Sequence, residues 1–388
     1  GNAQRELLLK PMEEEDITEV SVFERVPINF APLYQCLYIY DCLGLRGEFQ
    51  QYYKDHRYQQ AQKLLGTREP DEFLMKYQDC FHSIAGFFIV ENHVLQTSNF
   101  LISASFMDQL WEYTMSQLRP LVNLSITLCG SAQKLKEMKE TLAVFCRTLG
   151  NIARNIGPLQ ESVKIPLRDR FLQIARNSIT QSFRAEFKSV AHFVPITAND
   201  YRTLVDRANL KELKQPSSAI KPTYSKTVPR CCQLILDFIS DFHKFGVGLP
   251  EFEQVIISTT EGLVDIMLES LGSCLAEAQR SGQGLKLVQV VQVITNHRRL
   301  RDTIPMFSQA LTERGIGGSG RTVHLNTEQR FNETLTKIEG ILLSVNEQNI
   351  RKIMCIDLNW TPTSKIATPR PHIKKFTSYM RATFPSLT

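Results

Sequence analysis

The sequence predicts an all-α fold, arranged as an elongated rod of two or more consecutive antiparallel helical bundles. Apolar residues recur at spacings of three and four through most of the chain, which is the pattern of amphipathic helices. Alternating strand patterns are almost absent. No motif returns at a fixed interval, which argues against a solenoid of short repeats. The short connections between the helical segments favour antiparallel neighbours.

The composition is that of a globular protein without a strong bias toward one kind of ligand. Of 388 residues, 43% are hydrophobic and 22% are charged, and the net charge of +5 does not by itself indicate nucleic acid. The nine cysteines are scattered without a Cys-x-x-Cys pair, which favours reduced thiols in a cytoplasmic protein. We expect no secretory signal peptide, because no basic and apolar leader opens the chain. A chain of this length predicts two or more domains.

Residues 1–66 are expected to hold an acidic linker and then a pair of helices. The linker, residues 1–28, contains the run Glu13-Glu14-Glu15-Asp16, and two basic against six acidic residues give the first 20 positions a charge of −4. Such a run is usually a solvated segment. Residues 29–66 show helical spacing on both sides of Gly44, where we expect the first helix of the pair to stop.

Residues 71–192 are expected to form a first helical bundle around one central helix. The run Ile84–Leu95 opens with seven apolar residues, and Phe73, Tyr77 and Phe81 lead into it at spacings of four. A membrane-spanning helix needs about 20 apolar residues, so the run is too short to cross a bilayer. A helix that is apolar on nearly all sides lies inside a multi-helix unit.

Polar residues and prolines predict where the helices of this bundle begin and end. Asp71, Ser131 and either Ser103 or Ser105 are expected N-caps, because their side-chain oxygens can accept hydrogen bonds from the free amides of a first turn. Pro120 is expected to end or kink its helix.

Residues 193–229 interrupt the helical pattern and predict a Pro-rich connection, with a short helix near residues 200–208. Its prolines are Pro195, Pro216, Pro222 and Pro229. Helical spacing then resumes over residues 230–388, which we expect to form a second helical bundle that is incomplete at its C-terminus.

No motif in the chain predicts catalysis. Gly315–Gly320 reads Gly-Ile-Gly-Gly-Ser-Gly, but it lacks the preceding strand and the Gly-Lys-Ser/Thr of a phosphate-binding loop, so we interpret it as a turn. The eight histidines form no metal-binding pair at helical spacing. We therefore expect no catalytic residue, no cofactor and no metal site.

Two basic clusters form the candidate contact surface, one after a short apolar helix at residues 287–294 and one near the C-terminus. Their members are Arg298, Arg299, Arg301, Lys374 and Lys375. A solvated face is the usual role of such charges. The functional alternative is contact with an acidic protein partner or with anionic lipid. Nucleic acid is not expected as a partner, because aromatic residues do not interleave with these charges.

Several blocks of sequence also carry a family resemblance. They read Asn29-Phe-Ala-Pro-Leu-Tyr-Gln-Cys-Leu-Tyr-Ile-Tyr40, Phe49-Gln-Gln-Tyr-Tyr-Lys-Asp-His-Arg57, Tyr77–Ser98 and Asp108-Gln-Leu-Trp-Glu112. Together these blocks resemble the Sec-fifteen family of exocyst subunits, and a more diffuse similarity continues to about residue 384.

The resemblance implies a helical rod of the vesicle-tethering-complex type, in a non-catalytic subunit that packs against other exocyst subunits. It also implies an effector of a GTP-bound Rab GTPase in exocytosis, cytoplasmic and peripherally associated with secretory vesicles and exocytic sites of the plasma membrane. Family members carry a coiled-coil region before the matching part, so we expect a middle-to-C-terminal fragment. The alternative is a helical module that binds anionic membrane lipid through the basic clusters.

Overall fold

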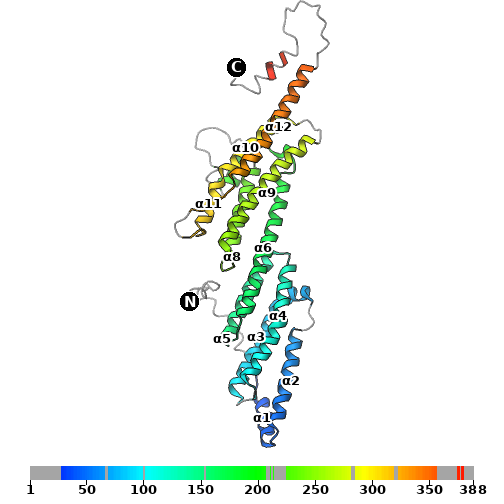
Figure 1. Ribbon diagram of the computed structural model, residues 1–388, viewed down its shortest axis with the longest axis vertical. Coiled ribbons are helices and arrows are strands. Elements are labelled where there is room, and N and C mark those ends of the chain that lie inside the picture. The colour runs from blue at the N-terminus through cyan, green and yellow to red at the C-terminus, as the bar shows by residue number, and fades with distance from the viewer. Residues whose placement is uncertain are drawn as a thin grey trace, which may run out of the picture. The chain divides into compact units, whose positions relative to one another are not determined.

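The computed structural model describes residues 28–65, 69–98, 101–152, 154–206, 210, 213, 224–280, 285–318, 322–355, 374–375 and 377–379. Its named α-helices are shown in Figure 1: α1 (Ala31–Cys42), α2 (Arg46–Leu65), α3 (Pro70–Thr97), α4 (Ala104–Leu128), α5 (Ala132–Asn151), α6 (Gly157–Glu186), α7 (Ala198–Tyr201), α8 (Thr227–Gly246), α9 (Phe252–Arg280), α10 (Leu287–Asp302), α11 (Ile304–Thr312) and α12 (Glu328–Cys355). The described residues contain no β-strand, only an isolated antiparallel bridge between Pro195 and Ser225. The predicted all-α fold class is confirmed.

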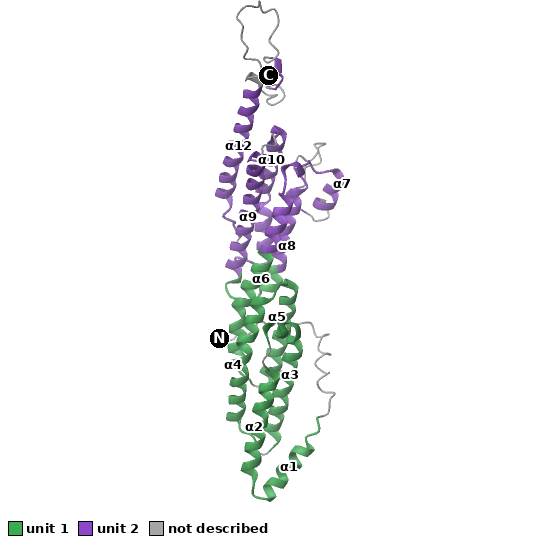
Figure 2. Cartoon of the chain, turned by 90° about the vertical axis from the view of Figure 1, so that its right-hand side faces the viewer, with its two compact units in different colours: residues 1–176, 242–252 green, residues 177–241, 253–388 purple. Residues whose placement is uncertain are grey.

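The chain divides into two compact units, which Figure 2 colours separately. The first contains the described residues up to Arg176 together with Phe242–Phe252. The second contains the described residues from Asn177 to Asp241 and from Glu253 onward. The chain therefore passes from one unit to the other at three points, which lie within α6, near the end of α8 and at the start of α9. The role of the predicted ranges as separate domains stays a prediction.

Helix α3 lies at the centre of the first unit, where it packs against α2, α4 and α5. Five side chains at spacings of three and four are buried: Phe73, Tyr77, Phe81, Ile84 and Phe88. The Phe88 ring meets the Trp111 ring of α4 nearly at right angles, with 5.0 Å between centroids. The Phe81 ring lies 4.7 Å from that of Phe145 in α5. The prediction of a buried central helix is confirmed.

Three predicted helix boundaries are confirmed. Ser103 Oγ accepts a hydrogen bond from the Phe106 amide at 3.2 Å and so caps α4. Ser131 Oγ accepts from the Lys134 amide at 3.3 Å and caps α5 in the same way. Gly44 adopts a φ of 72° just after α1, a conformation in which glycine carries no steric penalty.

Two predicted boundaries are wrong. Helix α3 begins at Pro70, before Asp71, and its cap residue Glu69 makes no side-chain hydrogen bond. A proline at the first position leaves one fewer amide to satisfy, which reduces the need for a cap. Helix α4 does not end at Pro120 but continues through it to Leu128, while a kink at this proline stays a prediction. The buried Leu118 and Val122 lie on either side of Pro120, so core packing holds both halves in one helix.

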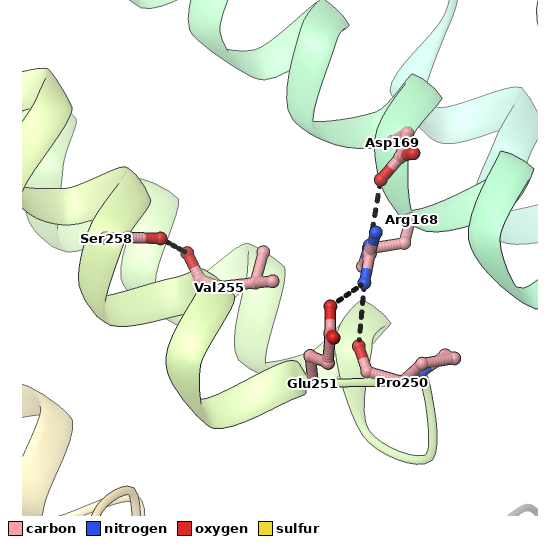
Figure 3. Close-up of polar contacts among 6 residues, drawn as sticks. All are labelled: Arg168, Asp169, Pro250, Glu251, Val255 and Ser258. Carbon is pink, nitrogen blue, oxygen red and sulfur yellow. Dashed lines mark hydrogen bonds and ion pairs between the residues drawn. The ribbon is translucent and has the colours of Figure 1, made fainter.

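The turn between α8 and α9 is held by Arg168 of α6, as Figure 3 shows. The Arg168 guanidinium donates to Asp169 Oδ1 at 2.8 Å, to Glu251 Oε2 at 3.0 Å and to the Pro250 carbonyl at 3.2 Å. Glu251 has a φ of 53°, a left-handed conformation that costs free energy for a residue with a Cβ. The arginine thus binds both the strained residue and its neighbour.

The Pro-rich stretch is folded where the structure describes it. A short helix does interrupt it, as predicted, in the form of α7 followed by a π-helical turn at Arg202–Asp206. Tyr224 is fully buried and its hydroxyl donates to the Leu213 carbonyl at 3.0 Å. The Ile196 amide donates to the Tyr224 carbonyl at 2.9 Å, which joins the two ends of the stretch.

Some expectations fall outside the described residues. These are the acidic linker up to residue 27 and most of the second predicted bundle beyond Cys355. Beyond Cys355 the structure describes residues 374–375 and 377–379, and Lys374 and Lys375 are helical.

Candidate functional site: the exposed face of α10

Helix α10 of the second unit has one buried face and one exposed face. It packs mainly on α12, beside which it lies in Figure 1. Its buried residues follow one another at helical spacing: Val290, Val293, Asn296, His297 and Leu300. Such an arrangement is that of an amphipathic helix on the surface of a bundle.

Two buried polar residues fix the rotation of α10 about its axis. Asn296 Oδ1 accepts from the Ser225 amide at 2.9 Å, and Asn296 Nδ2 donates to Ser225 Oγ at 2.9 Å. His297 Nε2 lies 3.0 Å from the Phe331 carbonyl, and because a carbonyl only accepts, this nitrogen carries the proton. Burial lowers the pKa of His297 to about 4, so the ring is neutral at pH 7. These directional bonds determine which side of α10 faces solvent.

The opposite side of α10 carries apolar and basic side chains together. Val288 is 77% exposed and Val291 is 48% exposed. Arg298 lies on the same stripe as these valines, Arg301 is exposed beside it, and neither arginine forms a hydrogen bond or ion pair among the described residues. We call Val288, Val291, Arg298 and Arg301 the α10 face. Interfaces typically combine an apolar centre with a polar rim, and arginine is enriched in them.

The structure separates the five predicted contact residues into three groups. Arg298 and Arg301 face solvent, as just described. The Arg299 guanidinium lies 5.9 Å from the centre of the Tyr224 ring and pairs with Asp302 at 3.6 Å, so its charge is engaged within the unit. Lys374 and Lys375 are exposed, and no hydrogen bond or ion pair among the described residues links them to α10. Contact with a partner through any of the five stays a prediction.

The exposure of Val288 and Val291 is not predicted from the sequence. Residues 287–294 read as one apolar helix, and an apolar helix is normally buried. The spacing of the residues does contain a signal for this exposure. Val288, Val291 and Arg298 share one stripe of the helix, while the buried residues occupy another. A stripe that begins with valine and ends with arginine indicates a solvent-facing apolar surface.

Other sites raised by the sequence find little support in the described residues. Within them, no three or more His, Cys, Asp or Glu side chains gather in a way that could hold a metal ion. No described helix is long and apolar enough to cross a membrane. In the described part of the glycine-rich turn, the Gly317 amide donates to the Glu253 carboxylate at 3.1 Å. A carboxylate at this amide disfavours a phosphate there, since like charges repel.

Comparisons with known proteins give this surface a family context. A family model described as Exocyst complex subunit Sec15 C-terminal matches residues 160–388, which include α10. Exocyst complex component 6B of Mus musculus is 25% identical over 97% of this chain and 47% of its own length, and the Homo sapiens protein of the same name matches equally. Exocyst complex component 6 of Dictyostelium discoideum is 23% identical over 96% of this chain and 41% of its own length.

The chain thus spans about half the length of the curated relatives it matches. No solved structure matches it. The family model covers more than half of the chain, and the relatives align along nearly all of it. The chain belongs to the Sec15 family of exocyst complex subunits.

Proposed function

We propose that this chain is part of a non-catalytic subunit of the exocyst vesicle-tethering complex, which binds sister subunits and acts as an effector of a GTP-bound Rab GTPase. Membership of the Sec15 family and the names of the relatives support the exocyst role. The proposal locates the chain in the cytoplasm, peripherally associated with secretory vesicles and exocytic sites of the plasma membrane.

The α10 face is the observation that carries the Rab part of the proposal. Val288 and Val291 leave apolar area in water, and burying each in a complex would contribute on the order of 1 kcal/mol. Arg298 and Arg301 would steer an acidic partner toward the valines, an effect that raises the association rate more than the affinity. GTP orders the switch segments of a GTPase, so a partner surface that needs those segments binds the GTP form selectively.

The direct test measures binding of the purified chain to a panel of Rab GTPases. Each is loaded with GDP or with a non-hydrolysable GTP analogue. We expect at least one Rab to bind tenfold more tightly in its GTP form, and a Val288→Asp/Val291→Asp variant to lose at least tenfold of that affinity. Leu343→Asp is the matched control, because Leu343 is 68% exposed on α12 outside the α10 face, and it should stay within twofold. Equal binding of both nucleotide forms would contradict the effector role.

A second candidate function is binding of anionic membrane lipid, which the solvent exposure of four cations favours. These are Arg298, Arg301, Lys374 and Lys375. Each would contribute about 1 kcal/mol next to an anionic membrane surface. Flotation with phosphatidylcholine liposomes, with and without phosphatidylserine, tests this candidate. If the chain binds anionic lipid, it should float with the phosphatidylserine liposomes and not with the neutral ones, and the Lys374→Glu/Lys375→Glu variant should not float with either. Equal flotation with neutral and anionic liposomes would contradict this candidate.

A further inference from the structure

Among the described residues, the pair of helices α1 and α2 in the first unit leaves an apolar surface uncovered. Helix α1 is mostly apolar, yet of its 12 residues only Leu37 is buried. Ile39 is 53% exposed and Leu43 is 64% exposed. A helix of this composition usually lies within a packed bundle. Exposed apolar patches of this kind mark interaction sites.

A groove of about 640 Å³ runs between these two helices. Pro32 and Cys36 line it from α1, and Tyr52 lines it from α2. Ile39 and Leu43 follow Cys36 at spacings of three and four, so they extend the same stripe of α1 beyond the groove. The apolar surface is therefore continuous along one side of α1.

The length of the groove matches a helix. On α2 its lining runs from Phe49 to Lys63, which corresponds to about 21 Å at 1.5 Å per residue. That is the length of about four helical turns. Grooves between helices commonly accept an amphipathic helix that inserts residues at i, i+3, i+4 and i+7.

The charged side chains that line the groove are all basic. They are His56, Arg57 and Lys63, and no Asp or Glu belongs to the lining, which lies within described helices. Arg57 is already paired with the buried Glu91 carboxylate, and its guanidinium lies 4.6 Å from the centre of the Phe87 ring. The unpaired positive charge of the lining is therefore that of Lys63, which has no ion-pair partner among the described residues.

We propose that the α1–α2 groove binds an amphipathic helix of a partner protein whose apolar stripe is flanked by acidic residues. The apolar stripe would cover Cys36 and its neighbours, and an acidic flank would lie against Lys63. An acidic flank fits this groove because, among the described residues, Lys63 is an unpaired cation in its lining, and no Asp or Glu belongs to that lining. The surface belongs to the first unit and is independent of the Rab contact proposed for α10.

A synthetic peptide pair tests the proposal on the full chain. The probe is a dye-labelled helix of 16 residues with leucines at i, i+3, i+4 and i+7 and glutamates on both flanks, and the control peptide carries lysines in place of the glutamates. Fluorescence anisotropy should show at least tenfold tighter binding of the acidic peptide. Cys36→Asp and Lys63→Glu should each weaken it at least tenfold. Tyr38→Asp should stay within twofold, because Tyr38 is 71% exposed on α1 but does not line the groove.

Four outcomes would overturn the proposal. Equal affinity for both peptides would remove the charge argument, and affinity unchanged by Cys36→Asp would place the binding elsewhere. A dimer of the chain in sedimentation that Cys36→Asp dissociates would make a second copy the occupant. A tenfold gain in peptide affinity after neutralising the run Glu13-Glu14-Glu15-Asp16 would instead make the chain's own acidic segment the occupant. Circular dichroism should show that each variant is folded, because Cys36, Tyr38 and Lys63 are all exposed.

Discussion

Replacing Phe88 with alanine tests whether α3 organises the first unit. The Phe88 side chain is fully buried, and its ring lies 5.0 Å from that of Trp111 and 5.3 Å from that of Phe87. A Phe→Ala change in a core costs about 3–5 kcal/mol, from lost transfer free energy and from the cavity left behind. We expect the upper part of this range, because Trp111 Nε1 donates to the Asn155 carbonyl at 3.0 Å and is thereby held back from filling the cavity.

Urea unfolding, followed by circular dichroism and by tryptophan fluorescence, measures this loss. Ile89→Ala is the matched control, because Ile89 is the next residue of α3 and is 37% exposed. Its partial exposure predicts a loss of about 1 kcal/mol or less. A Phe88→Ala loss as small as that of Ile89→Ala would refute the role of α3 as the central helix.

Three further predictions concern local features of the two units. Gly86→Ala should raise the free energy of unfolding by about 0.5–1 kcal/mol, because an added Cβ in mid-helix meets no atom within 4 Å. Gly246→Ala should lower it, because a Cβ at Gly246 would lie 2.6 Å from a phenylalanine ring carbon. Thermal unfolding should show these opposite signs, and equal signs would contradict the packing. Arg57→Met removes the cation beside the buried Glu91 carboxylate. Burial raises the pKa of Glu91 and Arg57 opposes that rise, so the substitution should lower the free energy of unfolding in urea by about 3–5 kcal/mol. A loss below about 1 kcal/mol would count against the ion pair. The pKa of His297 falls from an ordinary 6.5 to about 4 on folding, so between these pH values the unfolded chain binds the extra proton and the free energy of unfolding decreases as pH falls. That decrease should total roughly 3 kcal/mol and be absent in His297→Gln, and an unchanged pH dependence in the variant would refute it.

Local signals explain most of what the sequence predicts correctly. The spacing of Phe73, Tyr77 and Phe81 identifies α3, because a helix presents such residues on one face. Ser103 and Ser131 act as caps by accepting a hydrogen bond from the amide three residues later, so no residue distant in the sequence is needed to predict them. The family resemblance rests likewise on contiguous blocks of residues.

Features set by distant contacts were not predictable in this way. Pro120 has the local chemistry of a helix terminator, but buried neighbours on both sides keep α4 continuous. Glu91 occurs in the most apolar run of the chain, and only the fold reveals that Arg57 and the Tyr53 hydroxyl, 3.2 Å from its oxygens, compensate its burial. The exposure of Val288 depends on which face of α10 meets α12, and hydrophobicity alone does not specify that face.

The central claim of the proposed function is that the α10 face meets a GTP-loaded Rab. Amide hydrogen–deuterium exchange of the full chain, with and without a bound Rab, tests it most directly. The account predicts slower exchange across Leu287–Asp302 with the GTP-analogue form and no change with the GDP form. Protection confined to other helices, with exchange in α10 unchanged, would contradict it.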